Sequence, residues 1–150
     1  MGVKNIVDES FVGGTLYQGF LSQWYYHWLH APVSGKIIRS YRLQGGYYQQ
    51  NPSLDCSQES NLYYSQVYMS CVATRHVFII EADNPLIGRV AMIAIGMVEV
   101  SSCVSLVKDG DHVQKGMPIG RFEFGGSSHT LIFDRKAKLK FNSKIFERTI

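Results

Sequence analysis

The chain has 150 residues, of which 45% are hydrophobic and 18% are charged, and its formal net charge is +3. This balance excludes a disordered protein, and the length is sufficient to bury a substantial core. The positive charge is modest and gathers in one short segment near the C-terminus, so the composition argues against a nucleic-acid-binding protein. We expect a single domain spanning residues 1–150.

Cysteine usage and the hydrophobic pattern indicate the compartment in which the protein works. Cys56, Cys71 and Cys103 are odd in number, and neither they nor the five histidines have the spacing of a zinc site. Free buried thiols in a reducing compartment are therefore expected. The longest apolar run, 90–98, is much too short to span a bilayer. We predict a cytoplasmic protein without a transmembrane segment, and contact with a membrane surface stays open.

Apolar runs cut by turn residues predict a chain of α+β class that is mostly β, with few short helices. Residues 15–29 are rich in aromatic side chains without a clear 3.6-residue period, which predicts either a short helix or a strand. Further strands are predicted over 36–43, 61–74, 77–81, 90–100, 104–107, 119–124 and 131–133.

Glycine and polar residues predict loops and turns between these strands. The segment 43–61 is rich in Gln, Asn, Ser and Gly and is predicted to be a loop. Gly96 interrupts an apolar run and predicts a bulge. Asp109 and Gly110 follow a short strand and predict a hairpin-type turn.

Two segments of the chain resemble each other, APVSGKIIRSYRLQGGYY from residue 31 and VSLVKDGDHVQKGMPIGRFEF from residue 104. Both resemble the hammerhead pieces of lipoyl and biotinyl carrier domains, in which short strands turn at D-G-D and K-G. The resemblance implies a barrel-sandwich core, although a fold by itself carries no activity. No lysine follows where a carrier domain would need one, so carrier function is not expected. A non-catalytic binding module is the weakest of our hypotheses.

The segment FGGSSH, residues 124–129, joins two glycines, two hydroxyls and an imidazole. Taken alone, it is typical of a tight turn whose serines bond to the local backbone. Another motif, upstream in the chain, changes this interpretation. The segment FVGGTLYQGFLSQWYYHWLHAPVSGKI, residues 11–37, resembles the part of phosphatidylserine decarboxylases that carries F-x-x-G-T, L-S and Y-H-R-x-H-x-P-x-x-G. The matching residues are Phe11, Gly14, Thr15, Leu21, Ser22, Tyr26, His27, His30, Pro32 and Gly35.

A second motif follows in the order that this family shows. MPIGRFEFGGSSHTLIF resembles the family's G-R-F-x-L-G-S-T-V-x-x-L-F, with Ser128 in place of Thr. The other matches are Gly120, Arg121, Phe122, Gly126, Ser127, Ile132 and Phe133. The chain is therefore similar to the pyruvoyl-dependent phosphatidylserine decarboxylase family. The GGSSH form resembles the fungal branch that includes soluble tryptophan decarboxylases.

The resemblance implies that Ser127 becomes a covalent pyruvoyl group. Its hydroxyl attacks the carbonyl of Gly126, and the chain is cut between these residues into 1–126 and 127–150. A serine hydroxyl is a weak nucleophile that needs a base. The histidine of the family's Y-H motif fills that role and maps onto His27.

His30 maps onto the second histidine of the family motif. His30, Ser128 and His129 are the further candidates for binding the substrate or supporting these steps, although the family usually has an apolar residue at the position of His129. Without the resemblance, His27 and His30 would be core histidines among aromatic residues, or a pair of metal ligands three residues apart. No acidic or cysteine residue stands close by as a third ligand, so no metal is expected.

The implied activity is that of a carboxy-lyase, in which a substrate amine forms a Schiff base with the pyruvoyl group and carbon dioxide leaves. Phosphatidylserine is the first expected substrate, and a soluble aromatic amino acid such as tryptophan is the alternative. The family's P-A-D-G motif, whose aspartate orients the histidine, does not occur in this sequence. We expect a domain truncated at both ends, and an uncleaved, inert relative is the third hypothesis.

Two expectations concern partners. The basic run 135–140 is predicted to be a solvated strand face, with attraction to anionic lipid as the alternative. The exposed edges of a truncated sheet would favour a homo-oligomer.

Overall fold

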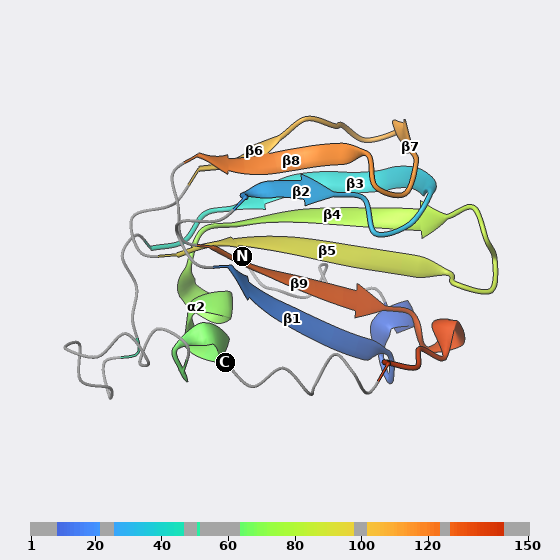
Figure 1. Ribbon diagram of the computed structural model, residues 1–150, viewed down its shortest axis with the longest axis horizontal. Helices are drawn as coiled ribbons and strands as arrows, with labels where there is room; N and C mark the ends of the chain where they lie inside the picture. The colour runs from blue at the N-terminus through green and yellow to red at the C-terminus, as the bar shows by residue number, and fades with distance from the viewer. Residues whose placement is uncertain are drawn as a thin grey trace.

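In the computed structural model, the described residues form two antiparallel β-sheets, one short α-helix and two single-turn 3-10 segments, Glu9–Phe11 and Arg135–Ala137 (Figure 1). This confirms the expected α+β, mostly β class. The statements below concern the residues that the structure describes, which are 9–21, 26–46, 51, 64–97, 102–123 and 127–142.

The larger sheet has six strands in the order β1-β9-β5-β4-β3-β7, and all neighbours pair antiparallel. In that order the strands are Thr15–Leu21, Ser127–Phe133, Arg89–Gly96, Arg75–Ala82, Gly35–Leu43 and His112–Val113. The residues 15–29 therefore begin with a strand and not a helix. The register of β9 against β5 runs unbroken to the pair of Ser127 with Gly96, so the predicted bulge at Gly96 is wrong. The irregularity lies in β3 instead, between Ile37 and Arg39.

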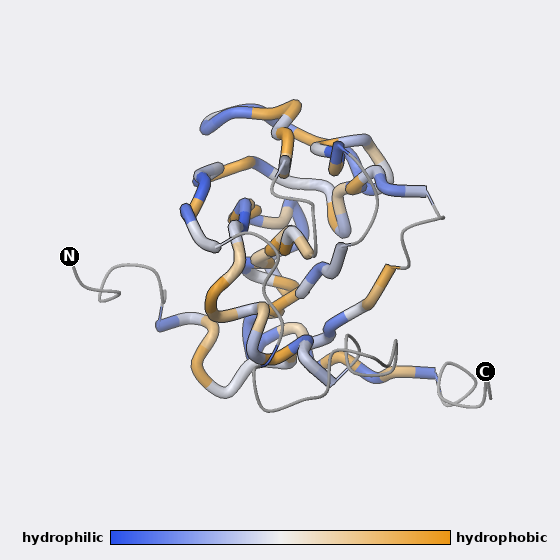
Figure 2. Tube along the Cα trace, turned by 90° about the vertical axis from the view of Figure 1, so that its left-hand side faces the viewer, coloured by the Kyte–Doolittle hydropathy of each residue, from blue (hydrophilic) through white to orange (hydrophobic). Residues whose placement is uncertain are grey.

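The smaller sheet has three strands in the order β2-β8-β6. They are Trp28–His30, Pro118–Glu123 and Ser102–Ser105. This sheet packs across one face of the larger sheet, and the buried core between them includes Leu29, Ile37, Phe78, Met92 and Phe122. Figure 2 views the molecule from the left of Figure 1, nearly along the strands, and shows hydrophobic and hydrophilic residues interspersed along the chain. Alternate side chains point to opposite faces of a strand, so every second residue of the larger sheet faces this core.

The helix α2, Gln66–Val72, covers part of the other face of the larger sheet. Met69 and Ala73 pack there against Ile95 and Met97. The predicted strand over 61–74 is therefore wrong where the structure describes it. Val and Tyr suggested a strand, and the polar Gln66 on the buried face obscured the helical period that Met69 and Ala73 continue.

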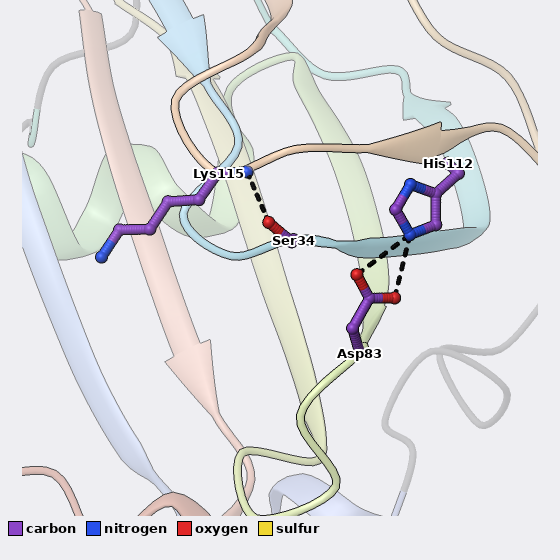
Figure 3. Close-up of polar contacts among 4 residues, drawn as sticks. All are labelled: Ser34, Asp83, His112 and Lys115. Atoms are coloured by element: carbon purple, nitrogen blue, oxygen red, sulfur yellow. Dashed lines mark hydrogen bonds and ion pairs between the residues drawn. The ribbon is translucent and has the colours of Figure 1, made fainter.

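The two segments that resemble each other lie side by side at one end of the sandwich. Backbone hydrogen bonds join Ile37 N to Asp111 O at 2.8 Å and Ala31 N to Met117 O at 2.9 Å. Figure 3 shows two side-chain links in the same region, where Lys115 N donates to Ser34 Oγ and His112 meets the Asp83 carboxylate. We call this region, residues 31–35, 83–88 and 106–118, the turn end.

The turn at Asp109 and Gly110 is present, and Gly110 has the left-handed φ of +94° that glycine tolerates. The expected hairpin is wrong, because the strands on either side of this turn belong to different sheets. The strand β6 pairs with β8, whereas β7 pairs with β3. The chain thus crosses between the layers at this turn, which helps to close the turn end.

The opposite end of the sandwich contains the ends of β1, β5 and β8 and the beginnings of β2 and β9, on the left of Figure 1. We call it the serine end, because Ser127 begins β9 there.

Three smaller expectations concern the basic run 135–140, the cysteines and the loop 43–61. The segment 135–140 is exposed for the most part, as expected, but it forms a 3-10 turn, Arg135–Ala137, and no strand. Asp134 explains this turn, because its side chain accepts a hydrogen bond from Lys136 N. Cys103 is buried but Cys71 is exposed, so the expectation of buried thiols is wrong for Cys71. Cys56 and most of the predicted loop 43–61 lie outside the described residues.

Candidate active site

Ser127 lies between two strands at the serine end. In the sheet it pairs with Leu21 of β1 on one side and with Gly96 of β5 on the other. Its side chain shares a face with Leu131, which packs into the core between the sheets, because residues two or four apart in a strand point the same way. Only 1% of Ser127 is exposed, and its Oγ has no hydrogen-bond partner among the described residues.

An unbonded buried hydroxyl is unusual, because burial without a compensating hydrogen bond costs about 1–3 kcal/mol. The neighbouring position on β5 is Gly96, so no side chain from that position fills the space beside the hydroxyl. Ser127 therefore combines a polar group, burial and a glycine neighbour, which suits a reacting group better than a structural one. Gly126 lies outside the described residues, so its carbonyl is not placed.

Ser128 points to the opposite face of the sheet, towards α2. Its Oγ donates to Gly19 O at 3.1 Å and accepts from Gln18 Nε2 at 3.1 Å. The two adjacent serines thus occupy different environments, because one is fully hydrogen-bonded and Ser127 is not. This division follows from the alternation of side chains along a strand.

His129 shares the inter-sheet face with Ser127, two residues further along β9. Its ring lies against Gly19, where an added Cβ would stand 2.7 Å from the ring carbon Cε1. The ring also lies 6.1 Å from that of Tyr17. Burial lowers the pKa of His129 below its ordinary value of 6.5, which favours the neutral imidazole. The glycine makes room for a histidine at this position.

The two histidines of the upstream motif lie in different surroundings. The carbonyl of His27 accepts a hydrogen bond from Phe122 N at 3.0 Å, and its ring meets the Phe122 ring edge-on at 6.2 Å. His30 Nδ1 instead lies 2.7 Å from Gly116 O and its Nε2 lies 2.8 Å from the Tyr26 hydroxyl. His27 therefore stands at the serine end, whereas His30 bonds to the turn end.

Two polar groups near the inter-sheet face carry no motif in the sequence. His76 is buried, lies 2.9 Å from Ser40 Oγ through its Nε2, and has its pKa lowered by desolvation and by Arg42. The Cys103 thiol lies 3.9 Å from Ala94 O, and burial raises its pKa to about 11. A thiol with that pKa stays protonated and is a poor nucleophile.

Neither a metal-binding cluster nor a membrane-spanning helix is found in the described parts of the chain. No group of three or more His, Cys, Asp or Glu side chains in them is arranged to hold a metal ion. None of their helices is both long enough and apolar enough to cross a membrane.

Comparison with known proteins shows which sequences this chain resembles. The family model for phosphatidylserine decarboxylase matches residues 2–149. The chain is 44% identical to decarboxylase iboD of Amanita muscaria, over 89% of this chain and 41% of that protein. It is 38% identical to L-tryptophan decarboxylase of Psilocybe cubensis, over 91% of this chain and 33% of the relative. It is 32% identical to phosphatidylserine decarboxylase proenzyme 2 of Oryza sativa, over 89% of this chain and 20% of that protein. The chain thus spans less than half the length of each of these relatives.

Proposed function

This chain belongs to the phosphatidylserine decarboxylase family, and from that premise we propose that it carries the self-processing core of a pyruvoyl-dependent decarboxylase. Ser127 is the proposed precursor of the pyruvoyl group. The observation that carries the proposal is the Ser127 hydroxyl, which is buried beside Gly96 and has no hydrogen bond within the described structure. Such a hydroxyl has no local bond to break before it attacks.

The proposed processing begins with attack of Ser127 Oγ on the carbonyl carbon of Gly126. The C–N bond breaks as the C–O bond of an ester forms, and the hydroxyl proton passes through a base to the amide nitrogen. His27 is the proposed base. Loss of the Cα proton of residue 127 then expels the Gly126 carboxylate and leaves dehydroalanine. Tautomerisation and addition of one water release ammonia and leave a ketone on the fragment 127–150.

The inter-sheet face offers a fitting position for this group. A pyruvoyl group supplies an electrophilic carbonyl that binds a primary amine and accepts the electron pair left when carbon dioxide departs. His129 stands on the same face and is favoured in its neutral form, so it is suited to accept or return a proton there. The roles of His129 and His27 both belong to this proposal.

We propose a free aromatic amino acid as the substrate, ahead of phosphatidylserine. The chain is 38% identical to the Psilocybe cubensis protein named L-tryptophan decarboxylase and 32% identical to the rice phosphatidylserine decarboxylase proenzyme. The sequence GGSSH, with His129 after the serine pair, also resembles the tryptophan branch. Phosphatidylserine is the second candidate, because the family model bears its name.

The test is carbon dioxide release from the purified protein, with tryptophan and with phosphatidylserine vesicles as separate substrates. The proposal predicts release from tryptophan that disappears in Ser127→Ala. Release only from phosphatidylserine would move the assignment to the second candidate. A processed protein that releases carbon dioxide from neither substrate would contradict both substrate assignments, and an unprocessed one would favour the inert hypothesis.

A further inference from the structure

A closed hydrogen-bond network joins Gln18 of β1 to α2 and to the start of β9. Gln18 Nε2 lies 3.1 Å from Ser128 Oγ, 3.0 Å from Ser70 Oγ and 3.5 Å from Gln66 Oε1. A side-chain amide carries two hydrogens, so the two shorter contacts use both of them.

The direction of each bond in this network follows from its other partners. The Ser128 hydroxyl gives its one hydrogen to Gly19 O, and the Ser70 hydroxyl gives its own to Gln66 O at 2.7 Å. Each hydroxyl must therefore accept from Gln18, which sets the orientation of the amide. Only 1% of Ser128 is exposed, so water cannot replace this donor.

From this arrangement we infer that Gln18 is a positioning residue for the self-cleavage proposed above, on which this inference rests. Gln18 holds Ser128 to β1 and α2 on one face of the sheet. Ser127 is the next residue, and its hydroxyl has no bond of its own among the described residues. The position of the attacking oxygen is therefore set through the backbone that Gln18 and Ser128 fix. Small displacements of a reacting group cost rate steeply, up to about 100-fold for 1 Å.

The experiment compares two isosteric substitutions in the full chain, Ser128→Thr and Ser128→Val. Threonine keeps an acceptor for Gln18 and valine does not, while the two add nearly the same volume at a buried position. Intact-mass spectrometry follows the rate of cleavage between Gly126 and Ser127 in folded protein. We expect Ser128→Val to cleave about 10- to 100-fold more slowly than Ser128→Thr.

A second variant links this effect to Gln18. Gln18→Met retains length but has no donor, and we expect it to slow cleavage to a similar degree. In the Ser128→Val background it should add little, because the contact has already been lost. Ser105→Ala is the matched control. It removes another part-buried hydroxyl that bonds to Ser40 and Val107 in the region of the turn end, and it should leave the cleavage rate unchanged.

The outcomes separate this inference from the proposed function. If the wild-type chain cleaves and both Gln18→Met and Ser128→Val cleave as fast as the wild type, the role of Gln18 is overturned and the proposed function stays intact. A wild-type chain that does not cleave overturns the proposed function and this inference with it. Equal slowing by Ser105→Ala would show a general effect of lost stability and would overturn the positioning role.

Discussion

The two ends of the sandwich satisfy their polar groups in different ways. At the turn end, backbone groups bond to one another, as Ile37 N does to Asp111 O, and the ion pair between Asp83 and His112 is exposed. At the serine end, the polar side chains of Ser127 and Ser128 are each only 1% exposed, and one of the two has no bond among the described residues. The turn end follows the ordinary rules for a stable fold, whereas the serine end departs from them.

This difference agrees with the proposal that the turn end maintains the fold and that the serine end holds the reacting group. Proteins depart from local rules of packing and hydrogen bonding mainly at functional sites, at some cost in stability. Changes at the serine end should therefore affect processing more than stability, and changes at the turn end should do the reverse.

Ser127→Ala should abolish self-cleavage and leave the protein folded. Removing a buried hydroxyl that lacks a hydrogen bond should leave the free energy of unfolding unchanged or raise it by about 1 kcal/mol. Gel electrophoresis of the chain and urea unfolding measure the two effects. A large loss of stability would show that the hydroxyl is structural and would contradict the separation of the serine end from the turn end.

Gly35→Ala should have the opposite profile at the turn end. An added Cβ would stand 2.2 Å from Glu81 O, a backbone atom that cannot move away easily. We expect a loss of about 3 kcal/mol in the free energy of unfolding, measured in urea, with unchanged cleavage per folded molecule. Lys36→Ala, at the exposed neighbouring position, is the control and should cost less than about 0.5 kcal/mol.

The free energy of unfolding should decrease as the pH is lowered, because two histidines are buried. Burial lowers the pKa of both His76 and His129 below 6.5, so the unfolded chain binds protons that the folded chain does not. The loss should begin as the pH drops below 6.5 and should be complete below the lowered folded-state pKa values.

Urea unfolding between about pH 8 and about pH 5 measures this dependence. His129→Gln should reduce the slope because it removes one of the two groups. An unchanged slope in both His129→Gln and His76→Gln would contradict the burial of these imidazoles.

Asp83→Asn should have the smallest effect. The Asp83 and His112 side chains are 53% and 58% exposed, and exposed ion pairs contribute little. We expect less than about 0.5 kcal/mol in the free energy of unfolding, and no change in cleavage. A loss of several times that size would show that the turn end depends on this pair more than on its backbone bonds.

Much of the fold was predictable from the sequence because strands leave local signals. The strands β3, β4 and β8 follow runs of apolar or alternating residues, and the motif around Ser127 is contiguous. The helix α2 was missed because Gln66 lies on its buried face. The network at Gln18 was also beyond prediction, because its partners Gln66, Ser70 and Ser128 lie 48, 52 and 110 residues away in the chain. No local pattern records contacts of that range.

The intact mass of the purified, denatured full chain is the most direct test of self-cleavage at Ser127. We expect two fragments, 1–126 and 127–150, with a ketone and no amine at the start of the second. Together they should have gained one water and lost one ammonia relative to the intact chain. A single uncut chain of 17.0 kDa would contradict the claim that Ser127 is the precursor of a pyruvoyl group in this protein.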